Sequence, residues 1–256
     1  MSKTDSHGTK TIAVCGKGGV GKTSISALMA KILIRRQNFK VLAIDADPAM
    51  GLATNLGMQA QKTVDDIRND LIERVKRGEA GDRKEMIAHL DYELFSALAE
   101  RENLMFLAIG RPEQEGCYCQ VNHFLRDIIA SVAQSFDAVI IDGEAGIEQI
   151  NRRVMETVTH LVVVSDLSVK GIQVAKTIQD VSKTSVPYRQ SGLILNRLRI
   201  GEDKADINIP SDVKYLGWIP EDDIIREYDI AGRSFLEMDE GASIHAVANC
   251  MNAMGL

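Results

Sequence analysis

The chain has 256 residues, and its hydrophobic content of 45% is enough to form a large buried core. Its 30 basic and 36 acidic side chains give a net charge of −6, which does not provide the positive field that non-specific nucleic-acid binding requires. No run approaches the roughly 18 apolar residues of a membrane span, and 4 cysteines are too few for a disulfide scaffold. We therefore expect a cytoplasmic protein with neither nucleic acid nor membrane as a partner.

Apolar runs alternate with amphipathic segments along the chain. The runs have the length and β-branched content of buried strands and lie at 11–15, 40–48, 104–110, 137–143, 160–166, 191–197 and 214–220. Most are separated by helix-length connections, whereas 59–103 is polar and helical in pattern, with a turn signal at 78–81. This alternation predicts a single-domain α/β fold, with a mainly parallel twisted sheet, helices on both faces and a helical insertion at 59–103.

A glycine-rich motif follows the first apolar run. Residues 16–23 satisfy G-x-x-x-x-G-K-[ST], and the apolar spacing after them is that of a helix. In this pattern backbone N–H groups face the phosphates, Lys22 adds a positive charge, and Thr23 offers a hydroxyl to Mg²⁺. We expect a flexible segment at 1–10 and a P-loop ATPase domain at 11–256. The residues in this motif and directly after it that we expect to bind ATP or ADP are Gly16, Lys17, Gly18, Gly19, Val20, Gly21, Lys22, Thr23 and Ser24.

Carboxylates stand where two of the predicted strands end. Asp142 follows four apolar residues, as a Walker B aspartate does, and would hold Mg²⁺ through water; its alternative is a residue that only caps the strand. Asp45 and Asp47 lie two residues apart, with Asp47 expected in the turn after the strand. Because ligands of open α/β sheets bind beyond the carboxyl ends of the strands, one of the pair can serve the magnesium site and the other can orient the attacking water.

Lys17 makes the motif K-G-G-x-G-K-T, and with it the chain resembles the deviant Walker A ATPases, the group of the nitrogenase iron protein and the Min and Par positioning ATPases. The resemblance implies a nucleotide-sandwiched homodimer in which Lys17 reaches the partner's phosphates. It gives Asp47 the hydrolytic role beside Lys17 and Lys22, and it places Asp45 with Thr23 and Asp142 at the magnesium ion. The stretch 142–146 resembles switch II of that group. The residues that match its base-contacting positions are Asn196, Arg197, Pro220, Glu221 and Asp222.

Cys117 and Cys119 form a C-x-C motif. Two thiolates are half of a closed tetrahedral site, and a two-fold dimer would supply the other pair. Within the deviant Walker A group, this combination resembles the CooC-type nickel-insertion ATPases of carbon monoxide dehydrogenase and their acetyl-CoA synthase relatives. The resemblance implies a metallochaperone that binds Ni²⁺ or Zn²⁺ at the dimer interface and serves such a metalloenzyme as its client. The alternative is two incidental thiols near a turn. Cys15 and Cys250 are expected in the core.

Two other classes remain open. An electron donor like the nitrogenase iron protein takes its cluster cysteines from two separate segments, and here only the C-x-C region offers candidates. A Min-type ATPase is expected to carry a basic amphipathic membrane helix at its end, whereas 241–256 contains no lysine or arginine. A Par-type protein that rides on DNA needs a basic patch. The metal content of the purified protein separates the three classes.

Overall fold

The structure is a computed structural model that describes residues 8–79, 81–111, 119–143, 150, 154, 157–185, 187–199 and 209–256. Residues 1–7 of the expected flexible segment 1–10 lie outside this range, and Lys10 is the first residue of a strand. None of the described helices is long and apolar enough to cross a membrane.

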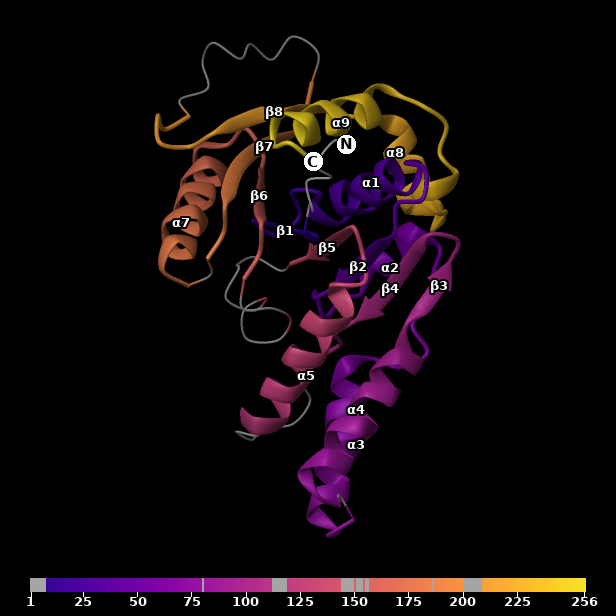
Figure 1. Ribbon diagram of the computed structural model, residues 1–256. Helices are drawn as coiled ribbons and strands as arrows, with labels where there is room; N and C mark the ends of the chain where they lie inside the picture. The colour runs from indigo at the N-terminus through magenta and orange to yellow at the C-terminus, as the bar shows by residue number, and fades with distance from the viewer. Residues whose placement is uncertain are drawn as a thin grey trace, which may run out of the picture.

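The described strands form one eight-stranded sheet with the order β3-β4-β2-β5-β1-β6-β7-β8 (Figure 1). All neighbouring strands pair in parallel except β3 and β4, which are antiparallel. The mainly parallel sheet is confirmed, but the prediction for 59–103 missed β3, a half-exposed edge strand of three residues. The strands are β1 (Lys10–Gly16), β2 (Val41–Asp45), β3 (Ala99–Arg101), β4 (Leu104–Ala108), β5 (Ala138–Asp142), β6 (His160–Ser165), β7 (Gln190–Leu198) and β8 (Tyr215–Pro220).

Helices cover both faces of the sheet, as predicted. Because successive side chains of a strand point to opposite faces, Ile12 and Val14 pack with α1, α2 and α9, whereas Ala13 and Cys15 pack with α3, α4, α5 and α7. Both cysteines outside the C-x-C motif are buried and free, which confirms their expected place in the core. The helices are α1 (Lys22–Ile34), α2 (Gly51–Leu56), α3 (Val64–Lys76), α4 (Arg83–Ala97), α5 (Cys119–Ala133), α7 (Val169–Ser185), α8 (Asp223–Ala231), the short 3₁₀ helix η2 (Phe235–Glu237) and α9 (Ala242–Ala253).

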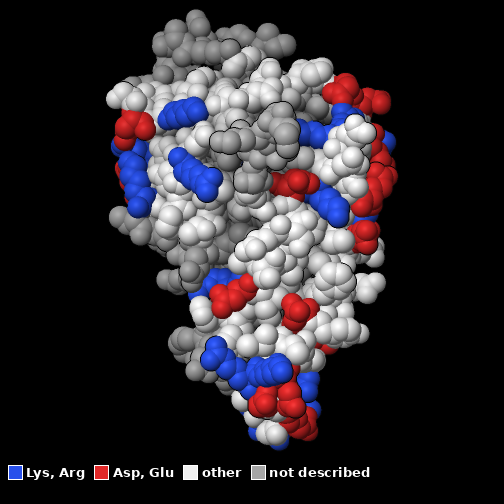
Figure 2. All heavy atoms as spheres, in the orientation of Figure 1, with Lys and Arg blue, Asp and Glu red and all other residues white. Residues whose placement is uncertain are grey.

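Helices α3 and α4 form a hairpin that projects away from the sheet, with α5 beside it (Figure 1). Each begins with a capping box, at Thr63 for α3 and at Asp82 for α4. The turn predicted at 78–81 lies between the two helices. Figure 2 shows acidic and basic side chains interspersed at the tip of this hairpin, in keeping with the alternating charges of its sequence.

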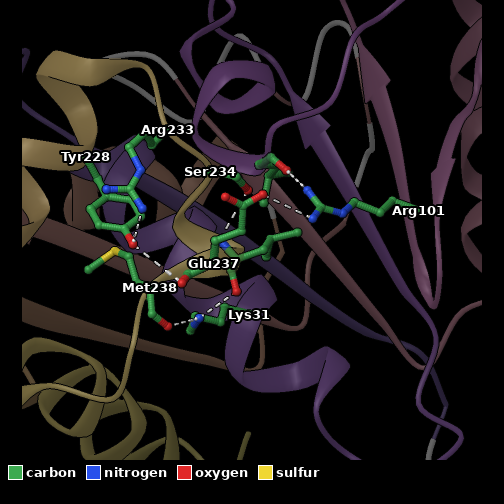
Figure 3. Close-up of polar contacts among 9 residues, drawn as sticks. Lys31, Arg101, Tyr228, Arg233, Ser234, Glu237 and Met238 are labelled. Atoms are coloured by element: carbon green, nitrogen blue, oxygen red, sulfur yellow. Dashed lines mark hydrogen bonds and ion pairs between the residues drawn. The ribbon is translucent and has the colours of Figure 1, made fainter.

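The segment around η2, residues 232–240, lies across α1 and α2, and we call it the strap. Lys31 of α1 is only 1% exposed and donates to the carbonyl oxygens of Leu236 at 2.7 Å and Met238 at 2.6 Å (Figure 3). Arg101 of β3 donates to the carbonyl oxygen of Leu56 at 3.3 Å and lies 3.5 Å from the Glu237 carboxylate. The strap therefore ties the edge of the sheet to the helix that follows the glycine-rich loop.

Candidate nucleotide-binding site

The glycine-rich loop joins β1 to α1 at the carboxyl edge of the sheet. Gly16 has a φ of +153°, and a Cβ atom there would lie 2.1 Å from the carbonyl oxygen of Val164 on the neighbouring strand β6. Gly21 has a φ of +89°, and a Cβ atom there would lie 2.4 Å from Nδ2 of Asn196. These two glycines are required by their surroundings. Gly18 and Gly19 face open space, which leaves the backbone of the loop accessible to a ligand.

The two lysines of the loop differ in their surroundings. Lys22 is 8% exposed, and its Nζ donates to the carbonyl oxygen of Lys17 at 3.3 Å, so its ammonium group is held over the loop. The Lys17 ammonium lies 3.6 Å from the Asp166 carboxylate at the end of β6, and these side chains are 38% and 40% exposed. A pair so open to solvent contributes little stability, so Lys17 can leave Asp166 at small cost.

Asp45 and Asp142 stand side by side at the ends of β2 and β5. Both are completely buried. Asp45 accepts hydrogen bonds from the backbone N–H groups of Asp47 at 3.1 Å and Leu52 at 2.9 Å. Burial, and then the neighbouring Asp142 charge, raise the pKa of Asp45 to about 7. Burial also raises the pKa of Asp142 to about 6, although the Thr23 and Ser26 hydroxyls lower it.

These groups fit a magnesium ion. One carboxylate oxygen of Asp142, Oδ2, is buried and accepts no hydrogen bond from the described residues. The Thr23 hydroxyl is close enough to lower the pKa of this carboxyl, and the raised pKa values of both aspartates reflect buried negative charge that a cation would stabilise. Mg²⁺ takes oxygen ligands, with one or two carboxylates completed by phosphates and water. Asp47 lies in the turn after β2, is half-buried, and accepts a hydrogen bond from the Ala49 N–H at 2.9 Å.

A cavity of about 260 Å³ lies beside the loop, between α1, the ends of β7 and β8, and α8. Asn196 donates through Nδ2 to the carbonyl oxygen of Val20 at 2.8 Å, and Arg197 donates through Nη1 to that of Gly19 at 2.9 Å, so the end of β7 is tied to the loop. The predicted nucleotide residues that line the cavity are Ser24, Asn196, Arg197, Pro220, Glu221 and Asp222.

Two groups of predicted residues are not placed in this site by the described part of the structure. Cys117 and residues 144–146 of the proposed switch II lie outside the described residues, and Cys119 is described only as the first residue of α5. Among the described residues, no group of three or more His, Cys, Asp or Glu side chains could hold a metal ion. A larger cavity, of about 610 Å³, lies near the amino ends of β1 and β6. Thr11, Arg126 and Thr159 are among the residues that line it, and none of the predicted site residues does.

Two residues of this site, Ser26 and Asp166, were not among those predicted from the sequence. Ser26 donates to Asp142, and Asp166 pairs with Lys17. Helical spacing could have pointed to Ser26, because it follows Thr23 by three residues and so lies on the same face of α1. Nothing in the sequence singles out Asp166 beyond its place at the end of an apolar run.

Residues 9–190 match the family described as AAA domain, and the chain therefore belongs to this family. It is a P-loop ATPase of the deviant Walker A type. The chain is 34% identical to the ATP-binding protein MJ0685 of Methanocaldococcus jannaschii, over 91% of this chain and 93% of that protein. It is 28% identical to the carbon monoxide dehydrogenase accessory protein CooC of Rhodospirillum rubrum, over 89% of each. The cell division ATPase MinD of Pyrococcus furiosus has the same fold, with a TM-score of 0.67 and 24% identity over 96% of this chain and 98% of that one.

Proposed function

We propose that this ATPase is a nucleotide-dependent homodimeric metallochaperone that assists the maturation of a carbon monoxide dehydrogenase or an acetyl-CoA synthase in the cytoplasm. The observation that carries the proposal is the Cys117-x-Cys119 motif of the sequence, whose second cysteine is the first residue of α5, in a chain similar to CooC over nearly its whole length. The metal ion, Ni²⁺ or Zn²⁺, is the cargo of the protein.

The nucleotide half of the proposal rests on the loop and the strand ends. Lys22 contacts the phosphates, and Thr23, Asp45 and Asp142 hold the magnesium ion, which stabilises the negative charge that develops on the transferred phosphate. Asp47 orients the attacking water, since it lies beyond the strand with a carboxylate oxygen available. Asn196 and Arg197 receive the base in the cavity of about 260 Å³.

The dimer half rests on Lys17 and the two cysteines. Among the residues that the structure describes, the Lys17 ammonium group pairs with Asp166 alone, and because this pair is exposed to solvent Lys17 is free to reach the phosphates of a second chain. The two thiolates of one chain complete a four-coordinate site with those of the other, because a two-fold interface repeats every ligand. The fold shared with MinD supports a second candidate, a positioning ATPase without a metal site.

Equilibrium dialysis against Ni²⁺ and Zn²⁺ tests the proposal. The wild-type protein should retain the metal, and the double variant Cys117→Ser, Cys119→Ser should lose it. The matched control is Cys250→Ser, because Cys250 is 1% exposed and burial raises its pKa to about 11, which keeps it from acting as a thiolate ligand. A wild-type protein that retains no metal would favour the positioning ATPase, and iron with sulfide in the purified protein would favour an iron–sulfur ATPase.

A further inference from the structure

Ser26 makes a contact that the loop motif does not account for. Its Oγ donates to Oδ1 of Asp142 at 3.0 Å, and both residues are completely buried. A serine inside a helix usually bonds a carbonyl of the preceding turn or points to solvent. Here the bond crosses from α1 to the end of β5, between residues 116 positions apart in the chain. This hydrogen bond therefore orients the carboxylate of Asp142 and is not part of the hydrogen bonding within the helix.

The bond distinguishes the two oxygens of the Asp142 carboxylate. Oδ1 is occupied by the Ser26 hydroxyl, whereas Oδ2 is buried and has no hydrogen-bond partner among the described residues. Leaving a buried carboxylate oxygen without a hydrogen bond costs free energy. The Ser26 hydrogen bond therefore holds the carboxylate in an orientation that is unfavourable as long as no metal ion is bound. The same carboxyl lies next to Asp45 and near the Thr23 hydroxyl, which are the other groups that fit magnesium.

We infer that Ser26 is a positioning residue, which holds the Asp142 carboxylate through Oδ1 and so keeps Oδ2 directed to the magnesium ion of the bound nucleotide. The inference rests on the proposed assignment of Asp142 to the magnesium site. The part of α1 that serves the magnesium site would then extend one turn beyond Thr23, to Ser26, which itself contacts neither the nucleotide nor the metal ion.

The test is a magnesium titration of the complex with a fluorescent ATP analogue, together with binding of the analogue in EDTA. Ser26→Ala should weaken the magnesium affinity about tenfold, the effect of one hydrogen bond to a charged group, and leave binding in EDTA unchanged. Ser26→Thr keeps the hydroxyl and should restore the affinity. The matched control is Ser243→Ala, since Ser243 is also completely buried but its hydroxyl has no hydrogen-bond partner in the described part of the chain. Ser26→Cys, which keeps the size of the side chain with a weaker donor, replaces the alanine variant if that variant does not fold.

Two results would overturn the inference. An unchanged magnesium affinity in Ser26→Ala would show that Asp142 needs no such support. An equal loss of affinity in EDTA would show that Ser26 maintains the whole loop. The variant Asp142→Asn tests separately whether Asp142 belongs to the magnesium site. If Asp142→Asn weakens the magnesium affinity and Ser26→Ala does not, only the role of Ser26 is wrong. If neither variant changes the affinity, the assignment of Asp142 is wrong as well.

Discussion

Asp45 and Asp142 place two acidic groups in a buried position where a cation is expected to sit. Their pKa values, about 7 and about 6, lie above the usual value of 3.8. Between about pH 4 and 7 these two groups therefore bind more protons in the folded state than in the unfolded state. Their contribution to the free energy of unfolding of the nucleotide-free protein should fall as pH rises through this window.

Asp45→Asn should flatten that fall. The variant removes one of the two charges, so the loss of stability between pH 5 and 8, on the order of 4 kcal/mol for the two groups together, should shrink by more than half. Chemical denaturation in EDTA at a series of pH values measures it. Asparagine has one acceptor oxygen for the two backbone donors of Asp47 and Leu52, and this lowers stability at every pH. The quantity to compare is therefore the slope of the free energy of unfolding against pH, not its value at one pH. A slope equal to that of the wild type would contradict the raised pKa of Asp45.

Lys22 and Asp47 should separate binding from turnover. Lys22→Ala should abolish nucleotide binding, because it removes the positive charge held over the loop. Asp47→Ala should bind normally and hydrolyse at least about a hundredfold more slowly, the usual effect of losing a group that handles the reacting water. Calorimetric titration and steady-state phosphate release measure the two effects. Normal hydrolysis by the Asp47 variant would refute its assigned role.

Which residues of the site could be predicted from the sequence depends on how close together in the chain the interacting groups lie. Lys22, Thr23 and Asp142 were predictable because a strand, a loop and a helix follow one another within a short stretch, or because a carboxylate ends an apolar run. The bond from Ser26 to Asp142 and the pair between Lys17 and Asp166 join segments more than a hundred residues apart, and no local pattern encodes them.

At the scale of elements, the same reasoning explains β3. Buried parallel strands are continuous apolar runs and are conspicuous in the sequence. β3 is three half-exposed residues that pair antiparallel with β4 after a turn at Glu102, whose φ is +54°. So short a segment has no resolvable periodicity, and its polar composition resembles that of the helices before it.

The contact between α1 and the strap can be tested through Lys31. Its ammonium donates to the part-buried carbonyl oxygen of Leu236 and the buried one of Met238, and burial lowers its pKa to about 8. Lys31→Met should destabilise the protein by about 2 kcal/mol, because both carbonyls lose their donor. Urea denaturation measures this. The control is Lys183→Met, because Lys183 forms an exposed pair with Asp180 and its loss should give no measurable change. Equal stabilities would show that the strap does not depend on this contact.

At the scale of the whole molecule, Lys17 should matter only when two chains meet. In one chain Lys17 pairs with Asp166, and Lys22 already lies over the loop. Lys17→Gln should therefore keep nucleotide affinity within about fivefold of the wild type, since an exposed pair contributes less than about 1 kcal/mol, and should impair dimerisation. Light scattering with a non-hydrolysable ATP analogue gives the dimer yield. An unaltered yield would count against a contact across the interface.

Metal binding and dimerisation should strengthen each other, because only the dimer contains four thiolates. Thiols near an unperturbed pKa of about 8.5 must lose their protons to bind metal, so the affinity should rise with pH across the neutral range.

Native mass spectrometry of the protein with Ni²⁺ and a non-hydrolysable ATP analogue tests the central proposal most directly. It reports the number of chains and of metal ions in the same particle. We expect dimers that carry one metal ion between two chains, and the loss of that ion, but not of the nucleotide, in the Cys117→Ser, Cys119→Ser variant. One metal ion on each monomer, or a metal-bound dimer that survives the double substitution, would contradict it.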